Sequence, residues 1–234
     1  MTKIIIDIVV SIIALLIFMP LIIFLIICVF FYDRKSPFYF SKRVGKDNNI
    51  FYMIKLRSMI VDADKTGVSS TASNDSRITY IGKYIRLLKA DELMQLFNVI
   101  KGDMSLVGPR PNVINEVSHY TNLEKKLLSV KPGITDFASI IFSDESKILM
   151  NKKDPDLSYN QLIRPSKSRL GLHYIKCMSL GIDTCLIFCT LISLFSRKTA
   201  LSFTAYLLKV TNADVDLQIL ALRREKLMYS LPPE

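Results

Sequence analysis

Two adjacent carboxylic acids, Asp91 and Glu92, stand at the start of an apolar stretch that reads as a helix. Neighbouring side chains on a helix point about 100° apart, so this pair cannot act as two equivalent groups on one face. The two carboxylates can instead do different work on one ligand. One can attack a phosphoryl group and form a covalent intermediate, while the other holds a magnesium ion against the phosphate charge. The plain alternative is that acids in a first helical turn stabilise the helix through its macrodipole.

Basic residues accompany this acidic pair. Those that lie near the expected helix, or in turns that can fold back on it, are Lys55, Arg57, Arg86, Lys89 and Arg110. Arginine presents a bidentate fork to phosphate oxygens. Arg110 lies between two prolines in the sequence GPRP, which restricts its backbone. The charge pattern therefore suits a site that binds a diphosphate.

The composition indicates a membrane surface or a phosphorylated substrate as the partner. Half of the 234 residues are hydrophobic, and 31 Lys and Arg against 21 Asp and Glu give a formal net charge of +10. A basic excess also suits nucleic acid, but the basic residues are not clustered with aromatic residues as a base-stacking platform requires. No spacing of the 4 cysteines and 2 histidines suits zinc, whereas a hard cation held by carboxylates stays open.

Residues 4–32 form an apolar segment longer than the roughly 20 residues that cross a bilayer as a helix. Pro20 lies near its middle and kinks or breaks a helix, and each half alone is too short to cross. Two arrangements are open: a spanning helix with a proline kink, or a helix that enters one leaflet, turns at Met19–Pro20 and leaves on the same side. Basic residues that follow, among them Arg34, predict that the downstream chain faces the cytosol.

The rest of the chain is expected to form a compact unit that positions the charged residues. In chain order we expect a β-hairpin with strands near 38–43 and 50–55, a polar loop over 61–77, a helix over 78–103, a second helix over 113–130, a strand over 138–143 and a helical stretch over 156–176. The apolar patch 177–195 is short, so we expect a helix in the membrane interface or packed in the core. The charged stretch 222–227 is compatible with a last helix.

Several motifs together resemble those of the bacterial sugar transferases, the monotopic phosphoglycosyl transferase superfamily. In chain order they are an apolar segment interrupted at Pro20, KRVG (42–45), FYMIKLRSM (51–59), IGKYIR (81–86), ADELMQLFNVIKGDMSLVGPRP (90–111), KPGIT (131–135) and HYIKCMSLGID (173–183). They cover most of residues 1–195, and the run over 90–111 is highly specific. No four-helix membrane module precedes the apolar segment, so the chain resembles the minimal catalytic type.

The resemblance implies a reaction. A phospho-sugar passes from a UDP-sugar to a polyprenol phosphate such as undecaprenyl phosphate, with release of UMP, as the first membrane step in the assembly of a bacterial capsule, exopolysaccharide or O-antigen. It implies that Asp91 attacks the sugar-bearing phosphate in a ping-pong mechanism and that Glu92 holds Mg²⁺. The residues it assigns to phosphate oxygens are Lys55, Arg86, Arg110 and Arg43. For Arg43 a structural role in the KRVG turn is an equal alternative.

The resemblance also implies the fold class, α/β and mainly α. A re-entrant helix-break-helix hairpin over 1–32, bent at Met19–Pro20 with both ends in the cytosol, precedes a compact catalytic domain over 33–204 with amphipathic interfacial helices. Residues 205–234 form a tail without an expected role. The expected location is the bacterial cytoplasmic membrane, in a monotopic arrangement against membrane lipid, with a homodimer left open.

The sequence departs from the family pattern at a few positions, and one of these departures bears on which sugar is transferred. Asp136 stands where glycine is common, near the place where sugar preference is expected to be set, so the sugar stays open. Met94 replaces a usual proline.

A non-catalytic relative that organises a glycan assembly complex is the alternative function, and such a relative would have lost the acidic pair or the basic residues. This chain keeps all of them.

Overall fold

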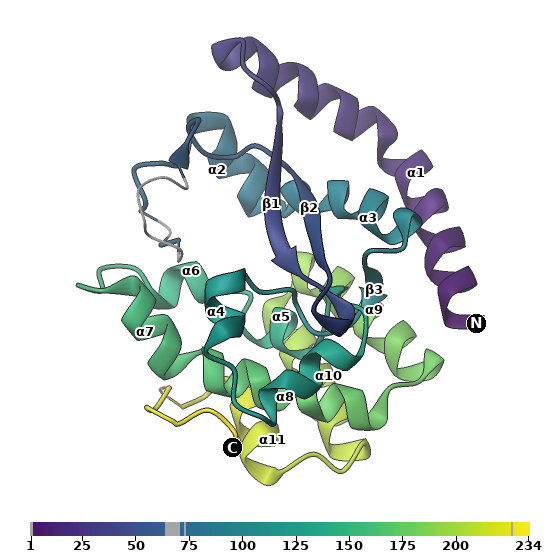
Figure 1. Ribbon diagram of the computed structural model, residues 1–234, viewed down its shortest axis with the longest axis vertical. Coiled ribbons are helices and arrows are strands. Elements are labelled where there is room, and N and C mark those ends of the chain that lie inside the picture. Colours follow the sequence, from purple (N-terminus) through teal and green to yellow (C-terminus); the bar gives the residue numbers. More distant parts are fainter. Residues whose placement is uncertain (1, 64–70, 73, 226) are drawn as a thin grey trace.

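The computed structural model describes residues 2–63, 71–72, 74–225 and 227–234. Helices dominate, and two small two-stranded sheets accompany them (Figure 1). The predicted mainly helical α/β class is therefore confirmed. The polar loop that the sequence predicts over 61–77 lies in part outside the described residues.

The first helix, α1 (Thr2–Asp33), contains Pro20 and is long and apolar enough to cross a membrane. It continues through Pro20, so the break expected there is a bend within one helix (Figure 1). Its inward face buries apolar side chains, among them Leu15 and Ile22, and packs against α3 (Gln95–Lys101). Whether the helix re-enters the membrane stays a prediction.

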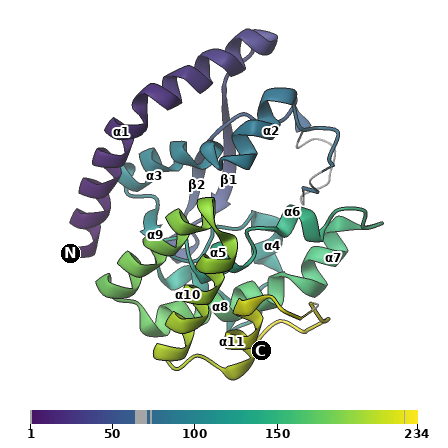
Figure 2. The same ribbon diagram turned by 180° about the vertical axis from the view of Figure 1, so that it is seen from behind.

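Both ends of α1 are bonded to the rest of the molecule. At its start, Lys3 Nζ lies 2.5 Å from Asp183 Oδ2. At its end, the guanidinium of Arg57 binds both carboxylate oxygens of Asp33, at 2.5 and 2.6 Å. Arg57 therefore secures the end of α1, and it is not part of the basic group around the acidic pair. Figure 2 shows α1 running along one side of the molecule with its start near α9 (Leu180–Phe195).

The predicted hairpin is confirmed as β1 (Phe38–Val44) and β2 (Ile50–Leu56), which pair antiparallel. Successive side chains of a strand point to opposite faces. Lys55 therefore shares a face of β2 with Phe51 and Met53, both of which are buried. The alternation turns the Lys55 ammonium group toward the interior of the protein.

The single helix predicted over 78–103 is wrong. The chain forms α2 (Tyr80–Leu87), a 3-10 helix η3 (Ala90–Met94) and α3 instead. Lys89 separates the first two, because its φ of 52° lies in the left-handed region and redirects the backbone. The acidic pair therefore opens a new short helix rather than continuing an old one.

A second, parallel sheet joins β3 (Ser105–Val107) to β4 (Gly133–Thr135), so the KPGIT motif (131–135) contains a strand. The strand predicted over 138–143 is wrong, because α5 (Phe137–Ile141) occupies this stretch. The side chain of Asp136 accepts a hydrogen bond from the Ser139 amide and caps this helix.

The remaining elements complete a helical layer around one core. They are η1 (Lys46–Asn48), α4 (Ile114–Ser118), η4 (Glu124–Ser129), α6 (Glu145–Ile148), α7 (Pro155–Leu162), α8 (Arg164–Cys177), α9, α10 (Arg197–Val210) and α11 (Val215–Leu222). The helix predicted over 113–130 is thus split in two. The predictions over 156–176 and 177–195 are confirmed as α7 with α8 and as α9. The described residues of the stretch 222–227 form no new helix, because α11 ends at Leu222 and Arg223 has a positive φ, and residue 226 lies outside the described residues.

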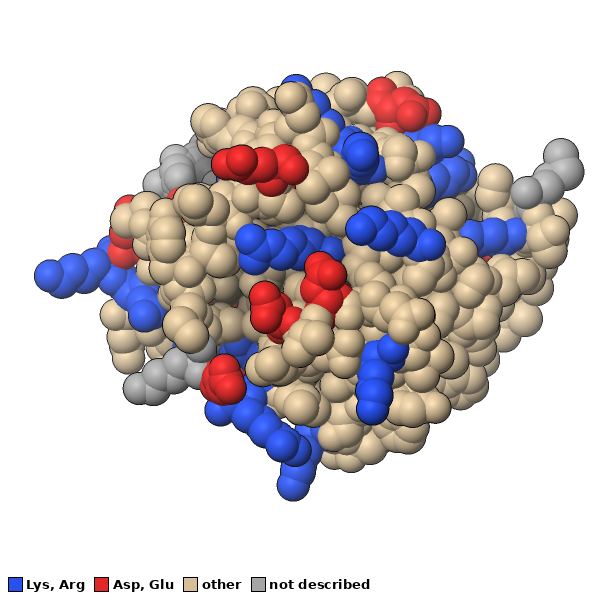
Figure 3. All heavy atoms as spheres, turned by 90° about the horizontal axis from the view of Figure 1, so that it is seen from below, with Lys and Arg blue, Asp and Glu red and all other residues tan. Residues whose placement is uncertain are grey.

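The division into 1–32, 33–204 and 205–234 stays a prediction, and α10 runs across residue 205. On the face seen in Figure 3, basic side chains are interspersed with acidic ones instead of forming one continuous stripe. The basic residues for which the sequence predicts a chemical role line one cavity.

Candidate active site

The acidic pair and its basic neighbours line one cavity of about 340 Å³. The six residues that the sequence assigned to the chemistry all line it: Arg43, Lys55, Arg86, Asp91, Glu92 and Arg110. They come from β1, β2, α2, η3 and the turn after β3. Met19 and Pro20 belong to α1 and do not line the cavity. The structure therefore gathers five separate segments around one space, while the roles of these residues stay predictions.

The two acids have opposite electrostatic environments. Asp91 is buried, and burial raises its pKa above the ordinary 3.8, although the charge of Lys55 opposes the rise. Burial alone would also raise the pKa of Glu92, but the charges of Arg110 and Lys55 outweigh it and lower that pKa to about 2. Arg110 Nη2 donates a hydrogen bond to Glu92 Oε1. Glu92 is therefore a fixed anion, whereas Asp91 has no such direct partner among the residues that the structure describes.

The cations near Asp91 are largely unpaired. Burial, with the positive charge of Arg110 as the next cause, lowers the pKa of Lys55 to about 8. Within the described part of the chain, Lys55 and Arg86 form no hydrogen bond or ion pair through their side chains. Unpaired cations beside a cavity can bind an external anion, and phosphate oxygens suit both an ammonium and a guanidinium.

Two other basic residues line the same part of the cavity as Lys55 and Arg86, namely Lys89 and Arg43. Lys89, which was noted only for its charge, lies in the left-handed link before η3, and burial lowers its pKa. Arg43 Nε donates to Ser41 Oγ at 3.1 Å, and burial together with nearby Arg110 lowers the Arg43 pKa. Arg43 therefore faces the cavity, and its own strand also holds it in place.

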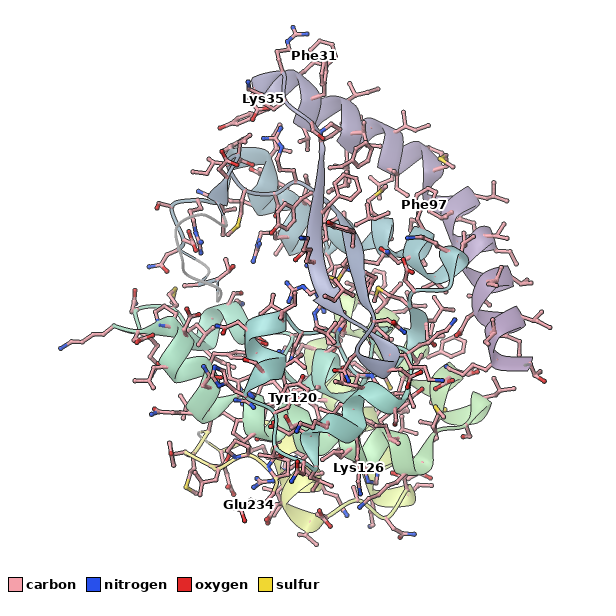
Figure 4. The ribbon with its side chains drawn as sticks, viewed as in Figure 1. Phe31, Lys35, Phe97, Tyr120, Lys126 and Glu234 are labelled. Atoms are coloured by element: carbon pink, nitrogen blue, oxygen red, sulfur yellow. The ribbon has the colours of Figure 1, made fainter. Side chains whose placement is uncertain are left out.

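The sequence reasoning missed the opposite half of the cavity. That half is lined by residues from α4 onward: Glu116, Tyr120, Asp136, Ser139, Glu145, Tyr159, Arg164, Lys167 and Ser168. Tyr120, which Figure 4 labels among the lower helices, is one of them. Each is an ordinary polar residue in sequence, and only the departure at Asp136 gave a signal. This half offers hydroxyl, carboxylate and ammonium groups to the part of a ligand that lies beyond its phosphates.

One buried ion pair and one partly buried ion pair hold this half in place. Glu124 is fully buried and binds Arg164 Nη2 at 2.8 Å and Ser168 Oγ at 2.6 Å. Lys167 binds Glu145. These bonds join η4 and α6 to α8. The wall opposite the acidic pair is therefore held together by contacts between separate helices.

The carboxylates do not form a metal centre by themselves. Among the described residues there is no group of three or more His, Cys, Asp or Glu that could hold a metal ion. Mg²⁺ is commonly bound by one or two carboxylates together with substrate phosphates and water. The single carboxylate of Glu92 is therefore compatible with a Mg²⁺ ion that phosphate and water ligands complete.

Comparison with known proteins identifies the family. The family model described as bacterial sugar transferase matches residues 1–197. The chain is 34% identical over 199 residues to a UDP-glucose:undecaprenyl-phosphate glucose-1-phosphate transferase of Xanthomonas campestris pv. campestris, covering 83% of this chain and 39% of the relative. It is 31% identical over 193 residues to a UDP-N-acetylgalactosamine-undecaprenyl-phosphate N-acetylgalactosaminephosphotransferase of Aeromonas hydrophila, covering 79% of this chain and 41% of the relative.

Coverage differs among the relatives. The chain spans well under half of the length of those two proteins. It spans 81% of the exopolysaccharide production protein ExoY of Sinorhizobium fredii, with 30% identity over 200 residues, or 79% of this chain. The match over residues 1–197 includes α1 and every segment that lines the cavity. The chain belongs to the bacterial sugar transferase family.

Proposed function

We propose that this protein transfers a sugar phosphate from a UDP-sugar to undecaprenyl phosphate or a related polyprenol phosphate. The carrying observation is a buried carboxylate, Asp91, in a cavity with two cations, Lys55 and Arg86, whose side chains bond to no other described residue. The printed functions of the two relatives above support the donor and the acceptor classes. The setting that we propose is the first membrane-bound step of bacterial polysaccharide assembly, and the printed name of the exopolysaccharide production protein ExoY supports the polysaccharide part of it.

The proposed first half-reaction forms an aspartyl phosphate, a mixed anhydride whose phosphorus still carries the sugar. An oxygen of Asp91 attacks the phosphorus that bears the sugar, and the bond from that phosphorus to the bridging oxygen of UMP breaks. UMP leaves with the bond's electron pair. Lys55, Arg86 and Arg110 neutralise the phosphate oxygens, which would otherwise repel the anionic attacker.

The proposed second half-reaction releases the product and restores the enzyme. A phosphate oxygen of the polyprenol phosphate attacks the same phosphorus, and the bond to Asp91 breaks. The product is a polyprenol diphosphate sugar. Because one carboxylate serves as attacking group and then as leaving group, the reaction is ping-pong.

We infer that Mg²⁺ assists when bound, with Glu92 and a donor phosphate as its ligands. The ion supplies charge neutralisation at the diphosphate. Arg110 holds Glu92 ionised and fixed, which keeps an oxygen ligand ready at neutral pH.

The proposed location is the cytosolic face of the membrane, with α1 lying re-entrant in it. Ion pairs join both ends of α1 to the same folded unit, and a helix that crossed the bilayer would carry one end away from it. Phe31 and Lys35 lie at the end of α1 farthest from its start (Figure 4), an apolar ring and a cation of the kind found at membrane interfaces. A polyprenol phosphate presents its phosphate at this level.

The test is UMP release from a panel of UDP-sugars by the purified full chain with Mg²⁺ and undecaprenyl phosphate. The expected result is lipid-dependent UMP from at least one sugar, with a phospho-sugar adduct on Asp91 in mass spectra when the lipid is omitted. UMP release without any such adduct, under conditions that trap half-turnover, would contradict the covalent route. An enzyme silent with every UDP-sugar would contradict the donor class.

A further inference from the structure

A second cavity, of about 300 Å³, lies between the start of α10 and the segment after α11. Its lining residues are Arg197, Lys198, Leu201, Ser202, Leu222, Arg223 and Arg224. Four of the seven are cations, and none of them lines the first cavity. All but the first lie beyond the family match, which ends at residue 197. The family relationship therefore assigns this cavity no role.

The positive charge of this cavity is poorly balanced. Asp144 accepts contacts from Arg197 Nη2 at 2.9 Å and from Arg223 Nη2 at 3.4 Å. Lys198 and Arg224 are exposed and form no ion pair with any residue that the structure describes. Asp144 thus contacts two of the four cations, and the other two have no acidic partner among the described residues. An anion in the cavity would remove the remaining repulsion.

Arg223 also has unused hydrogen-bond donors. Its side chain is only 11% exposed, and its Nε and Nη1 atoms are buried without a partner among the described residues. A buried N–H group that bonds to nothing costs stability, and such groups in proteins usually bond to a partner or to water. A phosphate oxygen accepts from a guanidinium in a charge-assisted bond, so it is a suitable partner.

The neighbouring surface is apolar and ends at this cavity. The outward side of α9 exposes Phe188, Leu191 and Leu194, and Phe195 at its end is 92% exposed. Arg197 and Lys198 follow at once. Apolar and aromatic side chains beside cations are the pattern of a helix that lies in a membrane interface, where anionic headgroups are found.

We propose that this cavity binds the phosphate group of an anionic membrane phospholipid. Lys198, Arg223 and Arg224 bind the phosphate oxygens, and the acyl chains lie over the exposed apolar side of α9. The unused donors and the excess charge call for a phosphate. The adjoining apolar surface favours a lipid as its source over free phosphate.

Two cations of the second cavity, Arg197 and Arg223, also contact one wall of the first cavity. Arg197 Nε donates to Ser143 Oγ at 3.2 Å, and the guanidinium of Arg223 lies 5.4 Å from the centre of the Phe142 ring. Ser143 and Phe142 both line the first cavity. A bound lipid would therefore contact the residues that support that wall, although the binding proposal itself does not depend on the transferase reaction.

The experiment is a titration of the purified full chain in neutral detergent, followed by native mass spectrometry. Phosphatidylglycerol, phosphatidylcholine and inorganic phosphate are added separately, without any UDP-sugar. The test variant is Lys198→Ala with Arg224→Ala, two exposed side chains that bond to no described residue. The matched control is Lys153→Ala with Lys209→Ala, which removes the same charge from exposed positions outside both cavities.

We expect saturable binding of one phosphatidylglycerol, weakened about 10-fold or more in the test variant and changed by less than about 2-fold in the control. Equal weakening in test and control variants would overturn the site, because diffuse charge would then explain binding. Unchanged binding in the test variant would overturn it as well. Inorganic phosphate binding as tightly as phosphatidylglycerol would overturn the lipid as source. Since no sugar donor is present, none of these results depends on the transferase proposal.

Discussion

At the scale of single residues, burial and one hydrogen bond separate two acids that are neighbours in sequence. Asp91 is desolvated without a direct partner, and Glu92 is held as an anion by Arg110. Desolvation makes a carboxylate a better attacking group, because its charge is less satisfied. A fixed, strongly ionised carboxylate suits the role of ligand. The two proposed roles thus follow from two environments.

Asp91→Asn is expected to reduce UMP release by about 1,000-fold or more, because the amide keeps the shape but cannot attack phosphorus. The measurement is the initial rate with the preferred UDP-sugar. Asp47→Asn, a change at an exposed position outside the cavity, serves as the control and should leave the rate unchanged. Substantial activity in the Asp91 variant would remove it from the role of nucleophile.

Glu92→Gln is expected to raise the Mg²⁺ concentration for half-maximal activity by about 10-fold, because a neutral amide is a poorer ligand. The measurement is a magnesium titration at fixed donor concentration. Glu116→Gln removes a carboxylate from another wall of the same cavity and should leave the midpoint in place. Identical midpoints for the wild type and the Glu92 variant would exclude Glu92 as the metal ligand.

The pH dependence of kcat/KM is expected to be bell-shaped, since this parameter reports groups of the free enzyme. Asp91 must be ionised to attack, and its pKa is raised, so activity should be lost as pH falls at values above the ordinary 3.8. Lys55 must be charged to bind phosphate, and its lowered pKa means that activity should be lost as pH rises through about 8.

Lys55→Arg provides the check on the alkaline side. A guanidinium stays protonated throughout this range, so the loss near pH 8 should move to higher pH even where the absolute rate drops. The measurement is the full profile of the variant against the wild type. An alkaline limb that stays near pH 8 in the variant would assign it to another group.

At the scale of secondary-structure elements, two glycines bring the GPRP turn against β4. A Cβ on Gly133 would lie 2.0 Å from the Gly108 backbone nitrogen, a distance that no real structure tolerates. Gly108 N also donates to Thr135 O at 3.0 Å. The close backbone contact positions Arg110, which lies two residues after Gly108. The motifs GPRP and KPGIT are therefore one structural unit.

Gly133→Ala is expected to lower the free energy of unfolding by about 1–3 kcal/mol, because β3 and β4 must move apart. The melting temperature should fall by several degrees, and UMP release should fall with it as Arg110 shifts. Gly181→Ala is the matched control, since a Cβ there meets nothing within 4 Å. Equal melting temperatures for the Gly133 variant and the wild type would mean that the two backbones are not packed as described.

The elements show which parts of the fold the sequence could predict. The hairpin and the helices α7, α8 and α9 follow from periodicity and from clear turn signals. The break at Lys89 does not, because a left-handed lysine carries no mark in the sequence and the apolar pattern continues across it. Asp136 was noted as a departure from the family pattern, yet its role as the cap of α5 decides helix over strand for 138–143.

The candidate site was also predictable only in part from the sequence. The acidic pair and its cations were found because charge of both signs gathers over a short stretch. The far wall, with Glu145 and Lys167, comes from distant helices that only tertiary packing brings near. Sequence patterns report local preference, and this wall depends on long-range contacts.

At the scale of the whole molecule, α1 is a helix with two unlike sides. Its inward side is tied to the folded unit at both ends. Its outward side exposes large apolar residues such as Leu16, Ile17 and Phe24, which are between 61% and 67% exposed. Exposed apolar surface of this extent requires a cover. A membrane that α1 enters and leaves on the same side, as proposed, would supply this cover without breaking either ion pair.

This arrangement predicts the sidedness of α1. Single cysteines in place of Thr2, Lys35 and Lys153, in a background without the four native cysteines, should all react with an impermeant maleimide only from the cytosolic side. The first two flank α1, and Lys153 is an exposed reference position between α6 and α7. Reaction at position 2 from the outside would mean that α1 spans the membrane. The Lys3–Asp183 pair could not then exist in the membrane-bound protein, because its two partners would lie on opposite sides of the bilayer.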